Sequence, residues 1–163
     1  MFVEKVCPVI FRRRNSQKEI LAFRHPLAGI QLVKGTVEEN EDLQAAALRE
    51  LAEESGISEV AEVEFKETLE FPEENQRWHF YLCEVKENLA DAWDFFANED
   101  GGLNFSFFWQ RLNEKPSGAW HPVHRKALDF IKNEFKIFRK LLENPKATAI
   151  KAKTVNCKFL IVS

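Results

Sequence analysis

The sequence predicts an α/β fold, a sandwich in which a mixed sheet of short strands surrounds one central helix and a second helix closes the domain. Three observations support this. Residues 42–55 are mostly Ala, Leu, Glu, Gln and Arg, which favour a helix. An apolar stripe of helical period follows Pro122 and continues to about Glu143. The segments around these two helices are short and apolar or alternating, which is typical of strands.

Composition indicates one ordinary globular domain. The chain has 163 residues, 45% of them hydrophobic and 30% charged, which suffices for a substantial core. No run approaches the ~20 apolar residues of a membrane span, and the N-terminus lacks a signal peptide's apolar stretch, so we expect no membrane contact. Cys7, Cys83 and Cys157 are odd in number and lack zinc-site spacing, which indicates reduced thiols and a cytoplasmic location.

Charge is distributed unevenly along the chain. The net charge of −3 is the sum of −10 over residues 1–124 and +7 over residues 125–163. A basic end could contact polyphosphate or RNA, although such a run is more often a solvent-exposed helix face. Because Pro145 stops the last predicted helix, we expect residues 1–143 to form the domain and residues 144–163 a C-terminal extension.

The segments before the central helix are predicted to be strands and polar turns. Residues 2–11 are apolar and β-branched enough for a strand, with Pro8 at an edge or a bulge. The other predicted segments are a polar hairpin loop at 12–18, a buried strand at 20–23, a turn at 24–26 and a strand at 30–33.

After the central helix, the pattern predicts three more strands. Residues 60–71 and 78–85 alternate apolar and polar side chains, as half-buried strands do. Residues 88–104 are polar and include a Gly-Gly pair, so we expect a long loop, a type of segment that is often functional. Residues 105–112 form the last predicted strand before the helix at Pro122.

The most informative stretch is residues 35–57, GTVEENEDLQAAALRELAEESGI. Glu50, Glu53 and Glu54 stand at i, i+3 and i+4 of the predicted helix, so their carboxylates crowd together and repel. A divalent cation reverses that repulsion, because Mg²⁺ binds carboxylate oxygens and shares its other positions with phosphates. Gly56 is suited to end the helix in the left-handed conformation. A helix with several glutamates is more often a solvent-exposed face, so the cluster alone is weak evidence.

The wider spacing is much more specific. The stretch meets every defined position of G-x5-E-x7-R-E-U-x-E-E-x-G-U, where U is aliphatic, from Gly35 through Glu41 and Arg49 to Ile57. It therefore resembles the Nudix box, and the chain resembles a Nudix (MutT-like) hydrolase. This resemblance implies the Nudix α/β/α sandwich with a mixed β-sheet over roughly residues 3–140.

The resemblance also implies an activity. Nudix hydrolases use Mg²⁺ or Mn²⁺ to hydrolyse a diphosphate linkage in a nucleoside diphosphate joined to another group, by water attack at phosphorus. By resemblance, Glu50 and Glu54 are the principal metal ligands, together with the carbonyl of Gly35. Glu53 binds a second metal or acts as the general base, and Arg49 orients Glu50.

Further candidate site residues lie outside the box. Arg24 could reach a phosphate or an acidic neighbour, and Lys34 directly precedes the box, so both are predicted to bind substrate. Trp78 could line a base-binding pocket, although packing is the commoner role for such a residue. Some members of the family take another acid from a loop before a late strand, and here Glu99 or Asp100 is so placed; a solvent-exposed loop acid is an equally good interpretation.

Two other classes of protein stay open. One is a nucleotide- or RNA-binding module that has the fold but no turnover. The other is a structural protein with an acidic helix. For an enzyme we expect a nucleotide or polyphosphate as substrate, with an RNA 5′ end and a homodimer as further possibilities.

Overall fold

The structure is a computed structural model that describes residues 1–98 and 101–143. It divides into two compact units, residues 1–127 and the remainder from Leu128. The described part of the second unit consists of the later turns of helix α2 (Pro122–Glu143). The bounds predicted for this helix are confirmed. The predicted extension, residues 144–163, lies outside the described residues. No helix in the described part of the chain is long and apolar enough to cross a membrane.

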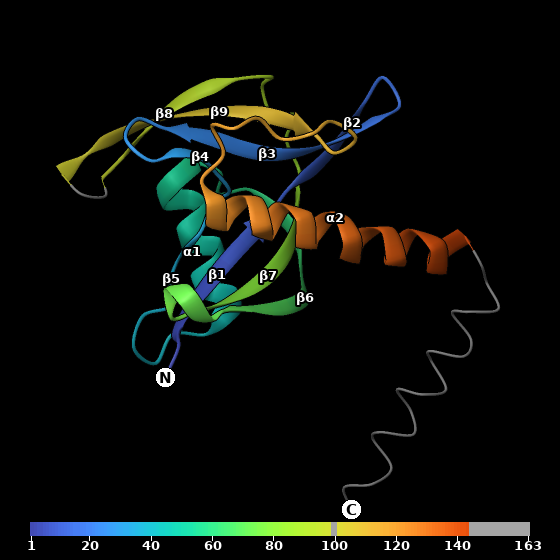
Figure 1. Cartoon of the computed structure of the whole chain (residues 1–163). Coiled ribbons are helices and arrows are strands. Elements are labelled where there is room, and N and C mark those ends of the chain that lie inside the picture. The colour runs from blue at the N-terminus through green and yellow to red at the C-terminus, as the bar shows by residue number, and fades with distance from the viewer. Residues whose placement is uncertain (99–100, 144–163) are drawn as a thin grey trace, which may run out of the picture. The chain divides into compact units, whose positions relative to one another are not determined.

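The first unit contains two sheets, which Figure 1 shows one above the other. One has the strand order β5-β1-β7-β6. β1 and β7 run parallel, whereas the β1–β5 and β6–β7 pairs are antiparallel. The predicted α/β fold with a mixed sheet is thereby confirmed. The strands are β1 (Val3–Val9), β5 (Gly35–Thr36), β6 (Val60–Phe71) and β7 (Gln76–Val85). A short 3-10 turn, η1 (Pro72–Glu74), joins β6 to β7.

The second sheet is antiparallel and has the order β2-β3-β9-β8, with β4 paired to β3. Its strands are β2 (Phe11–Arg14), β3 (Gln17–His25), β4 (Gly29–Gln31), β8 (Trp93–Ala97) and β9 (Leu103–Arg111). The hairpin predicted at residues 12–18 is confirmed, but its loop is shorter than predicted, because β2 and β3 pair up to Arg14↔Gln17 and leave only Asn15-Ser16 as the turn. Both turn residues have positive φ, 47° and 63°, as the favoured two-residue hairpin turns require.

The predicted loop at residues 88–104 is wrong, since it contains strand β8. β8 pairs with β9 from Trp93↔Phe107 to Ala97↔Leu103. The ring of Trp93 stacks on Phe107 with 4.9 Å between centroids, and this aromatic contact helps to bind the strand to the sheet.

Helix α1 (Leu43–Ser55) is the helix that the box predicts. Asp42 is its N-cap residue, and its carboxylate accepts a hydrogen bond of 3.0 Å from the backbone N–H of Ala45. Gly56 ends it in the left-handed conformation, with φ 77°, as expected. Both ends of the helix therefore follow from local sequence.

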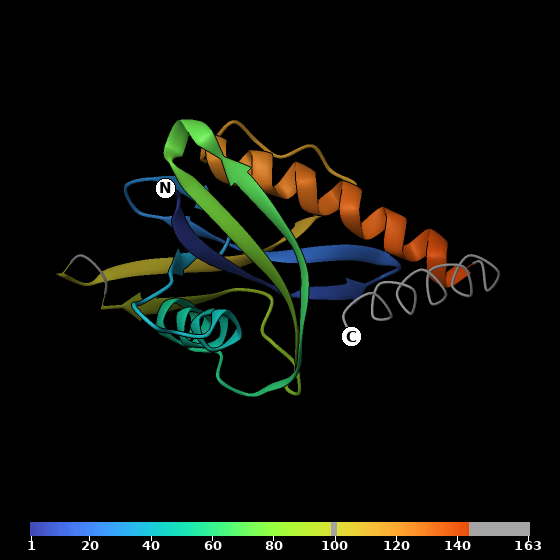
Figure 2. The same cartoon turned by 90° about the horizontal axis from the view of Figure 1, so that it is seen from below.

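The apolar side of α1 packs against both sheets, an arrangement seen from below in Figure 2. Ala46, Ala47 and Leu51 are fully buried. They share one core cluster with residues of both sheets, among them Val6, Tyr81, Cys83, Leu21, Phe23, Phe105 and Phe107. This packing fixes the rotation of the helix and so decides where its carboxylates point.

Candidate active site

The carboxylates of α1 face a cavity of about 480 Å³. Six residues predicted from the sequence line it: Lys34, Gly35, Arg49, Glu50, Glu53 and Glu54. The structure therefore brings together all four predicted metal-binding residues with Arg49 and Lys34. The cavity volume lies within the range of small-molecule sites, roughly 300–1,000 Å³.

Gly35, at the start of β5, allows a very close approach between strand and helix. A Cβ atom at this position would lie 1.7 Å from Cδ of Glu50, a distance that two non-bonded carbon atoms never adopt. The absence of a side chain therefore makes room for the Glu50 carboxylate directly against the backbone.

Arg49 holds three carboxylates in place. Its Nε and Nη2 donate to the two carboxylate oxygens of Glu41 at 2.7 and 2.9 Å. Its Nη1 donates to Glu50 at 2.8 Å and to Glu53 at 3.0 Å. These bonds raise the pKa of Arg49, that to Glu41 most. The hydrogen bond from Arg49, and a weaker one from the Glu38 N–H, lower the pKa of Glu41 to about 2. The orienting role predicted for Arg49 fits this network.

The two adjacent glutamates Glu53 and Glu54 lie in different environments. Glu54 is buried, and its carboxylate accepts a hydrogen bond of 3.2 Å from the backbone N–H of Lys34. The side chain of Glu53 is 53% exposed. Glu54 is therefore held in one place, as a permanent ligand would be, whereas Glu53 can change its orientation and reach water.

The residues of the cavity fit a hard divalent cation. Within residues 1–98 and 101–143, no three His, Cys, Asp or Glu side chains are gathered around one point. In this structure the three carboxylates are held by protein donors: Arg49 Nη1 donates to both Glu50 and Glu53, and the Lys34 N–H donates to Glu54. Three carboxylates beside a closely approached glycine backbone are nevertheless the oxygen-rich set that Mg²⁺ and Mn²⁺ prefer.

Sequence reasoning missed several residues of the cavity, among them Lys5, Gln31, Thr36 and Phe105. Lys5 brings a second ammonium group to the site, and its Nζ is hydrogen-bonded to Thr36. These residues carry no local signal, because pairing between distant strands places them here.

His25 also lines the cavity. Its Nδ1 accepts a hydrogen bond of 3.0 Å from the N–H of Leu27, which holds the ring at the turn that follows β3. Its ring lies 5.2 Å from that of Phe105, so the two rings form an aromatic wall of the cavity.

Two residues predicted to bind substrate lie elsewhere. Arg24 is exposed on the face of β3 opposite His25, since side chains alternate along a strand, and its guanidinium lies 5.0 Å from the ring of Phe108. Trp78 is 0% exposed and packs on Phe71 in the core. Neither residue lines the cavity. The buried Trp78 has the packing role that is commoner for such a residue, whereas substrate binding by the exposed Arg24 stays a prediction.

Glu99 and Asp100 lie outside the described residues, so the proposal that this loop supplies an acid stays a prediction. The residue before them, Asn98, lines a smaller cavity of about 390 Å³ together with Glu53. The described end of β8 thus comes close to the exposed carboxylate of the box.

Comparison with known proteins agrees with this geometry. A family model described as the NUDIX domain matches residues 5–130. Solved structures with the same fold include an Ap4A hydrolase from C. elegans, with 20% identity, 87% of this chain and 99% of that chain covered, and a TM-score of 0.55. The NUDIX domain of NrtR from Shewanella oneidensis, complexed with ADP ribose, has 15% identity, coverages of 83% and 89%, and a TM-score of 0.55.

A NUDIX hydrolase from Nitrosomonas europaea has 20% identity, covers 82% of this chain and 72% of that chain, and has a TM-score of 0.56. At these identities the structural likeness shows the fold alone. A search of curated proteins finds no match. The family model covers most of the chain, including the whole box and the strands around it, and the chain therefore belongs to the Nudix family of pyrophosphohydrolases.

Proposed function

We propose that the chain hydrolyses a diphosphate linkage in a nucleoside diphosphate joined to another group, with Mg²⁺ or Mn²⁺ held by the carboxylates of α1. Nudix enzymes generally use divalent metals. The main support for the proposal is that residues of the box and two lysines line the same cavity. The proposed metal-holding residues are Gly35, Glu50, Glu53 and Glu54, and the lysines are Lys5 and Lys34.

The names of the structural neighbours support this substrate class. Ap4A and ADP ribose, named for two of them, both contain a nucleoside diphosphate whose terminal phosphate carries another group. The ammonium groups of Lys5 and Lys34 would bind the phosphates. The rings of His25 and Phe105 offer an apolar surface for the attached group.

The chain's own residues have distinct roles in the proposed reaction. A bound divalent cation neutralises phosphate oxygens and makes a water molecule more acidic. The exposed carboxylate of Glu53 takes a proton from the attacking water, whose oxygen bonds to phosphorus as the P–O bond of the anhydride breaks. Arg49 orients Glu50 and Glu53, and the buried Glu54 stays in place through the Lys34 N–H. No covalent enzyme intermediate is formed.

Replacement of box glutamates tests this proposal. Glu53→Gln and Glu54→Gln keep the shape of the side chain but remove its charge, so we expect turnover to fall on the order of 10²-fold or more, as for other electrostatic catalytic groups. The measurement is hydrolysis of Ap4A and ADP ribose with Mg²⁺ or Mn²⁺ in water enriched in heavy oxygen. The label should enter a phosphate product. Glu62→Gln, an exposed glutamate of β6, is the matched control.

Several outcomes would contradict the proposal. Full activity in excess chelator would exclude the metal, and full activity of both Gln variants would exclude the box. Tight binding of these nucleotides without any hydrolysis would instead support the binding module without turnover.

We also propose a location of the protein in the cell. Cys7 and Cys83 are free and buried. Burial raises the pKa of both thiols, that of Cys83 to about 12. These reduced thiols support a cytoplasmic location, while Cys157 lies outside the described residues. The RNA 5′ end and the homodimer stay predictions.

A further inference from the structure

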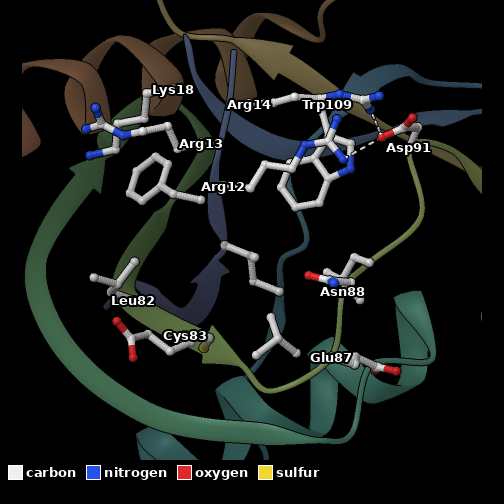
Figure 3. A pocket seen from close by; sticks show the side chains of 15 residues that line it. Arg12, Arg13, Arg14, Lys18, Leu82, Cys83, Glu87, Asn88, Asp91 and Trp109 are labelled. Atoms are coloured by element: carbon white, nitrogen blue, oxygen red, sulfur yellow. Dashed lines mark hydrogen bonds and ion pairs between the residues drawn. The ribbon is translucent and has the colours of Figure 1, made fainter. Parts of the chain in front are cut away.

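A second and larger cavity, of about 740 Å³, lies at the other end of β1. Lys5, early in β1, lines the catalytic cavity, whereas Ile10, just after β1, lines the second cavity. The two cavities share no lining residue. Figure 3 shows the second cavity between the β2–β3 hairpin, the end of β7 and the segment that leads to Asp91. Its volume is also suited to a small molecule, for which roughly 300–1,000 Å³ is typical.

Four cationic residues of the β2–β3 hairpin line one side of this cavity. Arg12, Arg13 and Arg14 are consecutive in β2, and Lys18 of β3 is directly opposite Arg13 in the register. Figure 3 shows Arg12 and Arg14 pointing toward Asp91, and Arg13 lying beside Lys18 on the other side of the view. The alternation of side chains along β2 produces this division into two cationic groups.

Arg12 is held rigidly at the rim. Its Nε donates to Glu19 at 2.6 Å, and Glu19 is only 6% exposed. The guanidinium lies 4.3 Å from the ring centroid of Trp109. The indole N–H of Trp109 in turn donates to the carbonyl of Ala90 at 2.9 Å. A guanidinium that is fixed by an acid and an aromatic ring loses little entropy when it binds an anion.

Asp91 shows where an anion would sit. Its carboxylate accepts a hydrogen bond of 2.8 Å from Arg12 and pairs with Arg14, and its side chain is 61% exposed. Two guanidiniums thus converge on one exposed carboxylate. A phosphate monoester carries more charge and three acceptor oxygens, so it can take the place of this carboxylate.

The opposite side of the cavity has a different chemistry. Glu87 and Asn88 lie there, and the whole lining also includes Glu84, Leu82 and Leu89. In Figure 3, Asn88 lies below Trp109 and Asp91, and Glu87 lies below Asn88. These oxygens accept hydrogen bonds from the hydroxyl and amino groups of a nucleoside. One end of the cavity therefore suits an anion, and the other end suits a neutral body rich in donors.

We propose that this second cavity binds a mononucleotide, with its phosphate between Arg12 and Arg14 and its nucleoside extending toward Asn88 and Glu87. Such a site goes beyond the proposed hydrolysis, because none of its residues belongs to the catalytic cavity.

Calorimetric titration of the full chain with adenosine 5′-monophosphate, in excess chelator, tests this site. We expect one-to-one binding that weakens about tenfold or more in Arg14→Gln, since a hydrogen bond between charged groups is lost. Asp91→Asn should instead tighten binding several-fold, because it removes the competing carboxylate. Adenosine alone should not bind, and inorganic phosphate should bind more weakly than the nucleotide. The indole N–H resonance of Trp109, assigned with Trp109→Phe, should shift on binding.

Two variants serve as controls. Arg77→Gln removes another arginine that pairs with two acids, Glu4 and Glu70, but does not line the cavity, so the affinity should not change. Glu53→Gln should also bind normally, and loss of binding there would place the nucleotide in the catalytic cavity and overturn the proposal. The proposal is equally overturned if the wild type does not bind, if Arg14→Gln binds as the wild type does, or if Asp91→Asn weakens binding.

Discussion

Gly35 decides how closely α1 approaches β5. A Cβ atom there would meet the Glu50 carboxylate, which the bond from Arg49 holds in place. We therefore expect Gly35→Ala to displace that carboxylate, to weaken Mn²⁺ binding and to lower turnover about 10²-fold or more, as when a preorganised electrostatic group is lost. Gly118→Ala is the control, since nothing lies within 4 Å of a Cβ atom at that position. Near-normal kcat/KM and Mn²⁺ affinity in Gly35→Ala would show that the close contact is not needed.

Single residues were predictable only where local spacing determines them. Glu50, Glu53, Glu54 and Arg49 meet in one cavity because helical periodicity places them on one side of α1. The position of Arg24 outside this cavity could not be predicted, because the segment around it does not reveal which face of β3 packs against the rest of the fold.

The N-terminal cap of α1 makes a separable contribution to stability. Asp42 accepts a hydrogen bond from the N–H of Ala45, which that N–H cannot obtain within the helix. Asp42→Ala should therefore reduce the free energy of unfolding by about 1 kcal/mol, whereas Asp42→Asn, which keeps an acceptor, should cost much less. Urea unfolding of the three proteins measures this difference. Equal losses in both variants would show that charge, and not the hydrogen bond, stabilises this end.

Elements differ in how well their own sequence defines them. Helix α1 has a periodic apolar side and a cap at each end, so its bounds are predicted to within a residue. Strand β8 has alternating Trp93, Phe95 and Ala97, but polar residues and a Gly-Gly pair surround it. Its stability comes from pairing with β9 and from the contact between Trp93 and Phe107, which depend on tertiary structure.

The whole catalytic cavity could not be predicted, because distant segments assemble it. Lys5 comes from β1, His25 from β3, Phe105 from β9 and the glutamates from α1. Pairing of β3 with β9 joins residues more than eighty positions apart, and no local pattern reports such pairing. The division into two sheets was missed for the same reason. The box thus pointed to the proposed ligands and to the neighbouring Lys34, while Lys5 and the aromatic wall required the fold.

His124 couples the stability of the whole first unit to pH. The side chain is 3% exposed, and its Nδ1 accepts a hydrogen bond of 3.0 Å from the N–H of Leu32. Burial, and then the positive charge of Lys34 and the neighbouring His121, lower the pKa of His124 well below 6.5. The folded protein therefore keeps His124 neutral at a pH where the unfolded chain already protonates it.

It follows that His124 lowers the stability of the folded state as the pH falls below about 6.5, the ordinary pKa of histidine. Below that pH the unfolded chain binds one more proton at this residue, so the free energy of unfolding should fall by up to about 1.4 kcal/mol per pH unit from this group alone. His124→Gln retains an acceptor for the Leu32 N–H but cannot titrate, so its stability should fall less steeply by that amount. Urea unfolding of both proteins between pH 7.5 and 5 gives the two slopes. Identical slopes would mean that His124 becomes protonated within the folded core, and the inferred coupling would be wrong.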